Sequence, residues 1–71
     1  MVRLNDAEYT YSPGMSLREL VDEHNAGKRK ALSFDGFIVL VNGAALSSMQ
    51  AEERLLRDND TIVIVPQLDG G

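Results

Sequence analysis

The sequence has no cysteine, no tryptophan and only two prolines. Without thiols, the chain can form neither disulfides nor cysteine-ligated zinc or iron–sulfur sites. Long apolar runs are also missing, because the longest, residues 37–41, is far too short to span a bilayer. The N-terminal residues lack the basic start and apolar stretch of a signal peptide. We therefore expect a cytoplasmic protein with no membrane partner.

Positive charge is scarce, since seven Lys and Arg residues stand against eleven Asp and Glu residues, for a formal net charge of −4. This balance argues against nucleic acid as a partner, because binding to phosphates requires Lys and Arg. We expect the only basic run, Lys28-Arg29-Lys30, to lie in a solvated turn near a helix C-terminus. A chain of 71 residues supports one domain with a thin core and little room for a deep pocket. We expect it to be a monomer when free.

The first part of the chain carries the signals of a hairpin and one long helix. Residue types that favour strands flank the turn-prone residues 5–6, which predicts a hairpin over residues 2–12. Ser16 stands three residues before Glu19 in a capping-box arrangement, which predicts a helix that begins at Leu17. Four residues at helical spacing form its expected apolar face: Leu17, Leu20, Val21 and His24.

The region after the helix offers little sign of catalysis. Gly27 is the expected stop, and residues 28–36 are expected to form a loop. We expect His24, the only histidine, to be a partly buried helix-end side chain rather than a base or metal ligand. Five acidic residues are interpreted as solvated charges with no second catalytic group nearby, so neither an enzyme nor a metal site is predicted: Asp22, Glu23, Glu52, Glu53 and Asp58.

The second part of the chain is dominated by two apolar runs. Residues 37–41 and 61–65 are predicted to be strands at the centre of a sheet, the second ended by Pro66. One face of these strands is needed for the core, and the other is a candidate docking surface. The sequence does not show which face has which role. Shorter elements are predicted between them: a turn at Asn42-Gly43, a strand at 44–46, a helical turn at 49–53 capped by Ser47-Ser48, core anchors at Leu55 and Leu56, and a polar turn at 57–60.

The order of these elements predicts an α+β fold. Strand, strand, helix, strand, short strand and strand do not alternate as in repeated βαβ units, so the four- to five-stranded sheet should be mixed. One main helix must cover it, as in the ubiquitin-like β-grasp fold. Residues 1–66 are expected to form this domain and residues 67–71 a flexible C-terminal tail.

The tail ends in Gly70-Gly71. Six extended residues, counted from Pro66, reach about 20 Å, which is long enough for the tail to extend from the domain into a partner rather than cover the domain's own surface. A terminal glycine has no Cβ beside its carboxylate, so the chain end can thread a narrow enzyme channel. That carboxylate is ionised at neutral pH and is a poor electrophile until it is converted to a mixed anhydride.

Several segments together resemble one family. They are residues 16–20 at the helix start, Val41-Asn42-Gly43, residues 56–60 before the last strand, and the terminal diglycine. Nearly the whole chain resembles the ThiS/MoaD-like sulfur carrier family, with the ThiS type of thiamine biosynthesis preferred. In that family a glycine commonly occupies the position of Asn59, and Asn is a residue that tolerates the same left-handed backbone.

The resemblance implies a protein substrate rather than an enzyme, with no cofactor bound to the chain itself. An adenylating enzyme that uses ATP and Mg²⁺ would activate the Gly71 carboxylate, and a cysteine desulfurase or rhodanese system would supply the sulfur of a thiocarboxylate. The acceptor would be thiazole synthase or the large subunit of molybdopterin synthase. Gly70 would give access to the partner's channel, and four residues would aim and seat the tail: Pro66, Gln67, Leu68 and Asp69.

Two alternatives remain open at the level of sequence. A ubiquitin-like modifier would share the fold and the activation step but would join Gly71 to a lysine of a target protein. With no residue following Gly71 in this sequence, no processing is expected in either role. A non-covalent β-grasp adaptor would bind through its sheet and make no use of its last residues. Deletion of Gly70 and Gly71 separates the adaptor from the other two.

Overall fold

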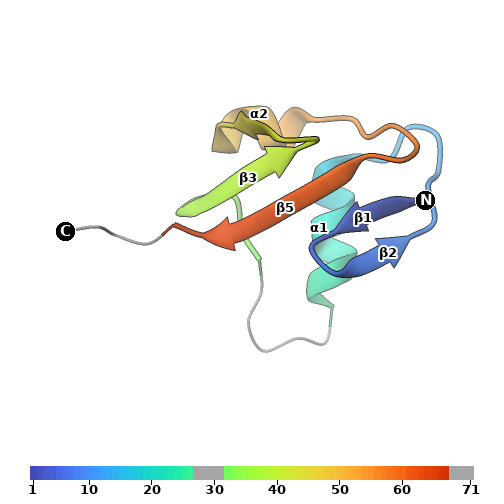
Figure 1. Cartoon of the computed structure of the whole chain (residues 1–71), viewed down its shortest axis with the longest axis horizontal. Coiled ribbons are helices and arrows are strands. Elements are labelled where there is room, and N and C mark those ends of the chain that lie inside the picture. The colour runs from blue at the N-terminus through green and yellow to red at the C-terminus, as the bar shows by residue number, and fades with distance from the viewer. Residues whose placement is uncertain (27–31, 68–71) are drawn as a thin grey trace.

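The computed structural model describes residues 1–26 and 32–67. Within these ranges the elements follow the order β1 (Val2–Leu4), β2 (Ala7–Tyr9), α1 (Leu17–Asn25), β3 (Phe37–Val41), β4 (Ala44–Leu46), α2 (Ser48–Glu53) and β5 (Thr61–Pro66). The strands form one sheet in the order β2-β1-β5-β3-β4, with β1 parallel to β5 and the other pairs antiparallel (Figure 1). The predicted α+β fold with a mixed sheet is confirmed, and β3 and β5 lie inside the sheet as expected.

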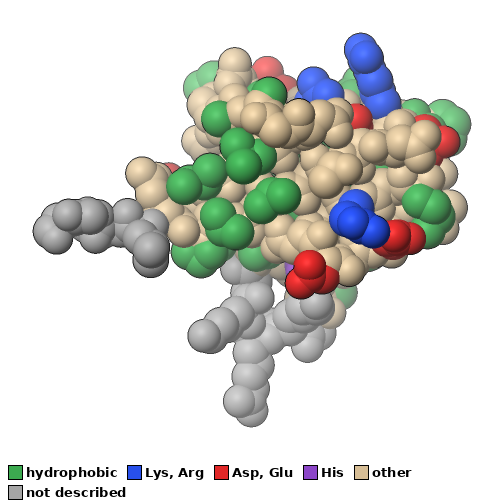
Figure 2. Space-filling view, in the orientation of Figure 1, with side chains coloured by type: hydrophobic (Ala, Val, Ile, Leu, Met, Phe, Trp, Pro, Cys, Tyr) green, Lys and Arg blue, Asp and Glu red, His purple; other side chains and the backbone are tan. Residues whose placement is uncertain are grey.

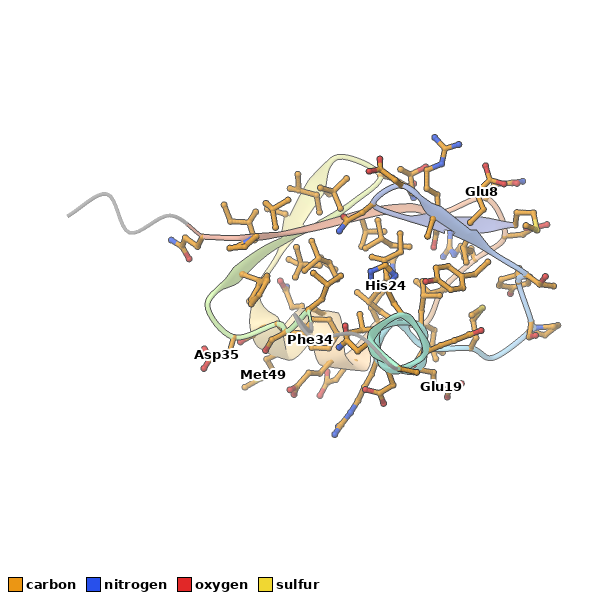
Figure 3. All side chains as sticks on the ribbon, turned by 90° about the horizontal axis from the view of Figure 1, so that it is seen from below. Glu8, Glu19, His24, Phe34, Asp35 and Met49 are labelled. Carbon is orange, nitrogen blue, oxygen red and sulfur yellow. The ribbon has the colours of Figure 1, made fainter. Side chains whose placement is uncertain are left out.

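Helix α1 packs against one face of the sheet, and the core lies between them (Figure 3). The helix begins at Leu17 as predicted, because the Ser16 hydroxyl oxygen accepts a hydrogen bond from the Glu19 backbone N–H at 3.1 Å. Leu17 and Leu20 are fully buried beneath β1 and β5, which contribute Leu4, Ile62 and Ile64 to the same core. The amphipathic spacing read from the sequence therefore corresponds to the face that covers the sheet.

Both hairpins turn on asparagines with a left-handed backbone. Asn5 has φ 53° between β1 and β2, and β2 ends at Tyr9, short of residue 12 where the predicted hairpin ends. Asn42, with φ 52°, and Gly43, with φ 86°, form the two-residue connection between β3 and β4. Positive φ at both central residues is the signature of the turn that matches strand twist in hairpins.

The Asn42 side chain also ties this hairpin to the start of β5. Its Oδ1 accepts from the Thr61 backbone N–H at 2.9 Å, and its Nδ2 donates to Asp60 Oδ1 at 2.9 Å. Asp60 is only 5% exposed, and its second carboxylate oxygen accepts from the Arg57 backbone N–H at 2.8 Å. The predicted polar turn over residues 57–60 is thus a hydrogen-bonded cap on the sheet, with Asn59 left-handed at φ 71° as expected.

The predicted anchoring role of Leu55 is wrong, whereas that of Leu56 is confirmed. Leu56 is 3% exposed, but the Leu55 side chain is 62% exposed. The backbone is extended here, since Leu55 forms an antiparallel bridge with Ser16. Neighbouring side chains of an extended segment point to opposite sides, so only one of the two leucines can enter the core.

The remaining connections agree with the sequence where the structure describes them. Residues 32–36 form no strand, and the helical turn after β4 is capped by Ser47, whose Oγ accepts from the Gln50 backbone N–H at 3.2 Å. The predicted helix stop at Gly27 and the predicted turn at Lys28-Arg29-Lys30 lie outside the described residues. Neither helix in the described part of the chain is long and apolar enough to cross a membrane.

Candidate functional site

Strand β5 ends at the far edge of the domain from the N-terminus, and this end is the root of the tail (Figure 1). Pro66 pairs with Phe37 as the last pair of the β3–β5 ladder. One residue further, the Gln67 backbone N–H donates to the Gly36 carbonyl oxygen at 3.0 Å. The other predicted tail residues, Leu68, Asp69, Gly70 and Gly71, lie outside the described residues.

The sequence predicts that the strand stops at Val65, before Pro66. In the structure Pro66 is itself the last residue of β5. Along a strand, the backbone N–H and C=O groups of one residue point to the same side, and the side alternates from residue to residue. Gln67 bonds toward β3, so the nitrogen of Pro66 faces the opposite side, where the described pairing of β1 with β5 stops at Leu4↔Ile62. Proline therefore costs the β3–β5 ladder no hydrogen bond at this position.

The face of the sheet away from α1 carries an apolar surface that leads to the tail root. Its residues, here called the outer apolar patch, are Ile38, Leu40, Ala45, Val63 and Val65. Ile38 is 40% exposed and Val65 is 41% exposed, and the two are cross-strand partners one pair before Pro66. Figure 2 shows hydrophobic side chains gathered over β3 and β5 toward the C-terminal end of β5.

The two faces of β3 and β5 that the sequence left equivalent are thereby distinguished. Val39 and Val41 on β3 are buried in the same core as the apolar face of α1, as are Ile62 and Ile64 on β5. The intervening residues lie on the opposite face of the sheet, which neither described helix covers (Figure 3). Isoleucine and valine side chains exposed side by side are typical of a protein interaction surface, so the outer apolar patch is the candidate docking face.

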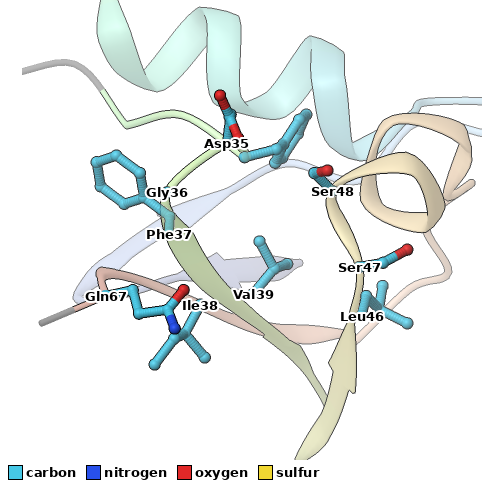
Figure 4. Close-up of a pocket in the computed structure, with 10 residues that line it drawn as sticks. Asp35, Gly36, Phe37, Ile38, Val39, Leu46, Ser47, Ser48 and Gln67 are labelled. Atoms are coloured by element: carbon cyan, nitrogen blue, oxygen red, sulfur yellow. The ribbon is translucent and has the colours of Figure 1, made fainter. Parts of the chain in front are cut away.

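A hollow of about 330 Å³ opens on the inner side of β3 at the same end of the domain (Figure 4). Phe34, Phe37 and Leu46 contribute apolar surface to it, and Gln67 lies at its border. The hollow is shallow and open, and Asp35 at its rim forms no ion pair within the described residues. It offers no second catalytic group to act with a carboxylate.

None of the five candidate acid–base residues lines the hollow at the tail root, although Asp22 and Glu52 line a second hollow together. Asp22, Glu23, Glu52 and Glu53 are all exposed on helices. Asp58 is exposed as well, and its carboxylate accepts from the Met1 amine at 2.6 Å, which lowers the pKa of the Asp58 carboxyl. Within residues 1–26 and 32–67, no group of three or more His, Asp or Glu side chains is placed to hold a metal ion.

His24 is partly buried near the end of α1, as predicted, and its ring lies between the helix and the sheet (Figure 3). Its Nδ1 is 2.6 Å from the Tyr9 hydroxyl oxygen, so the two side chains form a hydrogen bond from α1 to β2. Partial burial, followed by the charge of Glu23, raises the pKa of the Tyr9 hydroxyl. This pair lies in the body of the domain and joins a helix to a strand.

Two residues whose side chains support β5 were missed by the sequence reasoning. Asn5 was read only as part of a turn, yet its Oδ1 accepts from the Ile64 backbone N–H at 2.9 Å. Asp60 was read as part of a polar turn, yet it is a buried acceptor. The asparagine-rich turns were the available signal, but Asn42, which bonds Asp60, lies 18 residues from it in the sequence, and Ile64 lies 59 residues from Asn5.

Comparison with known proteins identifies the family. No curated protein matches the chain at a significant level. A protein-family model does match, and it covers residues 2–71, which include every element described above and the tail beyond them. The chain therefore belongs to the ThiS family.

Proposed function

We propose that this chain is a sulfur carrier of thiamine biosynthesis and that Gly71 carries the sulfur as a thiocarboxylate. The ThiS match over residues 2–71 is the observation that carries the proposal, since ThiS proteins are sulfur carriers rather than catalysts. The arrangement of the described site supports it, because the outer apolar patch leads directly to the root of the tail. A carrier needs a docking face and an outstretched end, and it needs no catalytic group of its own.

The chemistry begins at a carboxylate that is ionised at neutral pH and resists nucleophiles. In the proposed first step, a Gly71 carboxylate oxygen attacks the α-phosphorus of ATP on the activating enzyme and expels pyrophosphate. Sulfide, released from the donor's persulfide by a thiol that is oxidised to a disulfide, then attacks the acyl carbon, AMP leaves with the bridging oxygen, and the thiocarboxylate remains. Adenylation supplies the leaving group, and docking holds the reacting atoms together.

The residues between the domain and the diglycine have proposed roles in guiding the tail. Pro66 limits backbone freedom where the strand ends, and Gln67 is anchored to Gly36. Leu68 is the proposed apolar anchor in the partner's channel, and Asp69 adds a charge that the channel must accept. Gly70 supplies the narrow approach that lets the end of the chain reach the nucleotide.

The partners follow from this chemistry. They are an adenylating enzyme that uses ATP and Mg²⁺, a sulfur donor such as a cysteine desulfurase or rhodanese system, and thiazole synthase as the acceptor. Molybdopterin synthase is the next candidate acceptor. The carrier itself binds no cofactor in this scheme, because every group that activates the carboxylate belongs to a partner.

The test is the intact mass of the purified chain after incubation with a thiamine-type activating enzyme, ATP, Mg²⁺ and sulfide. The expected result is a gain equal to the replacement of one oxygen by sulfur. A chain lacking Gly71 is the control and should show no gain. No gain for the unaltered chain, either with this enzyme or with a molybdopterin-type one, would reject sulfur carriage.

A second arm separates the proposal from its alternatives. The chain is incubated with cell extract and ATP, and lysine-linked adducts are sought by mass spectrometry. Adducts in place of a thiocarboxylate would identify a protein modifier. Full support of the pathway in cells by a chain without Gly70 and Gly71 would identify an adaptor that binds through its sheet alone.

A further inference from the structure

The last described hydrogen bond between the tail and the domain is made by the turn before β3. The Gln67 backbone N–H donates to Gly36 O at 3.0 Å, one step beyond the Phe37↔Pro66 pair. The turn itself is closed by the Phe37 N–H, which donates to Phe34 O at 3.4 Å. The point at which the tail leaves the domain is therefore set by the conformation of residues 34–37 as well as by β5.

Gly36 determines that conformation. Its φ is +77°, in the region that L side chains rarely adopt, although a Cβ built there would meet no atom within 4 Å. A substitution at Gly36 is therefore opposed by the backbone and not by crowding. The strain would be relieved by a rotation of the turn, which would move the Gly36 carbonyl away from Gln67.

We propose that Gly36 is a positioning residue for the tail: its left-handed turn holds the Gln67 amide and so sets the direction and reach of residues 68–71. This inference rests on the proposed sulfur-carrier function, in which the Gly71 carboxylate must meet ATP on a partner. Four residues span at most about 14 Å beyond Gln67. Release of Gln67 would move the last fixed point back to Val65 and let the chain end sample more directions.

Docking and positioning are then carried by different residues. The outer apolar patch binds the partner and governs the KM for the carrier, whereas the Gly36 turn aims an already docked tail and governs kcat. A correctly oriented tail keeps the Gly71 carboxylate near ATP for a larger fraction of the time, and this proximity raises the rate of the chemical step. The two contributions are separable because Gly36 is outside the patch.

The test uses a matched pair of glycines in the full chain. Gly36→Ala is compared with Gly43→Ala, since Gly43 has φ +86°, lies in open space and occupies the turn at the other end of β3. Both variants strain a left-handed turn without a clash. Gly36→Asn is the rescue variant, because Asn5, Asn42 and Asn59 already adopt positive φ in this chain.

The first readout needs no partner. Amide hydrogen exchange at Gln67, measured by NMR, should accelerate about fivefold or more in Gly36→Ala, stay unchanged in Gly43→Ala, and return toward the unaltered rate in Gly36→Asn. The amides of Val39 and Ile64 report on the sheet and should change little in all three. Unchanged Gln67 exchange in Gly36→Ala would overturn the proposal.

The second readout is pyrophosphate exchange catalysed by the activating enzyme. Gly36→Ala should lower kcat roughly five- to tenfold with little change in KM, and Gly36→Asn should restore kcat. Equal losses in Gly36→Ala and Gly43→Ala would reduce the effect to general stability and overturn the proposal. No pyrophosphate exchange with the unaltered chain would reject the sulfur-carrier function itself. Normal exchange with an unaffected Gly36→Ala would reject only the positioning role.

Discussion

The Asn5 side chain takes both backbone hydrogen bonds of Ile64. Its Nδ2 donates to Ile64 O at 3.1 Å, and its Oδ1 accepts from the Ile64 N–H at 2.9 Å. The β1–β5 register ends at Leu4↔Ile62. Beyond it, the Asn5 side chain forms the hydrogen bonds to β5 that the backbone of a further β1 residue would form. Asn5 thereby supplies hydrogen-bond partners to the β5 backbone on the side that faces away from β3, close to the tail root.

Replacement of Asn5 by glycine should lower the free energy of unfolding by about 1–3 kcal/mol. Glycine keeps the positive φ but leaves the amide and carbonyl of Ile64 without these partners. Asn59→Gly is the matched control, since Asn59 also has positive φ and its side chain makes no hydrogen bond within the described residues. Urea denaturation measures both, and equal losses would contradict this account of Asn5.

Leu55 and Leu56 should differ sharply on truncation. Leu56→Ala removes a side chain that is 3% exposed and should cost about 2–4 kcal/mol through lost burial and the cavity left behind. Leu55→Ala removes one that is 62% exposed and should change the free energy of unfolding by at most about 0.5 kcal/mol. Thermal unfolding of the two variants checks this, and a large loss at Leu55 would show that it is packed in solution.

Stability should fall above pH 10 because of Tyr9. The pKa of the Tyr9 hydroxyl is raised in the folded chain, mainly by burial and then by Glu23, so the folded state holds this proton more tightly than the unfolded state. The contribution is complete below the unfolded pKa of about 10 and is lost as pH rises through the folded pKa. Urea denaturation at pH values from roughly 8.5 to roughly 11.5, a range centred on about 10, measures the slope of the free energy of unfolding against pH.

Two variants test the origin of this pH dependence. Tyr9→Phe should reduce the slope, because no hydroxyl remains to ionise. Glu23→Gln should lower the Tyr9 pKa toward its ordinary value while the hydrogen bond to His24 Nδ1 persists. Equal slopes for Tyr9→Phe and the unaltered chain would show that other groups cause the alkaline loss.

The outer apolar patch should govern affinity for the activating enzyme. A double variant, Ile38→Thr with Val65→Thr, keeps β-branched side chains in the strands but makes the exposed pair polar. It should raise the KM for the carrier about tenfold, with little change in kcat, since buried apolar contacts at an interface contribute mainly to binding. Pyrophosphate exchange measures both constants.

The control for the patch is Thr61→Val, at the opposite end of the same face of β5. It changes polarity in the reverse direction at a position outside the patch, so the KM should stay within about twofold of the unaltered value. An unchanged KM in the Ile38 and Val65 double variant would assign docking to another surface of the domain.

The sequence by itself determined the elements and the fold class. The spacing of Leu17, Leu20 and Val21, the Ser16 cap and the two β-branched runs are local signals, and each was sufficient to place its helix or strand. The pattern of elements then restricted the sheet to a mixed arrangement with β3 and β5 inside it. Such signals act over a few residues, which is why they can be read without knowledge of the partners.

Only the tertiary structure decided which surfaces face outward and what fixes the tail root. In an uninterrupted apolar run, both faces of a strand have the same character, so the position of α1 had to show that Ile38 and Val65 are exposed. The hydrogen bonds of Asn5 to Ile64 and of Gln67 to Gly36 join residues far apart in sequence. Their geometry arises when the sheet assembles, because β5 must first lie between β1 and β3.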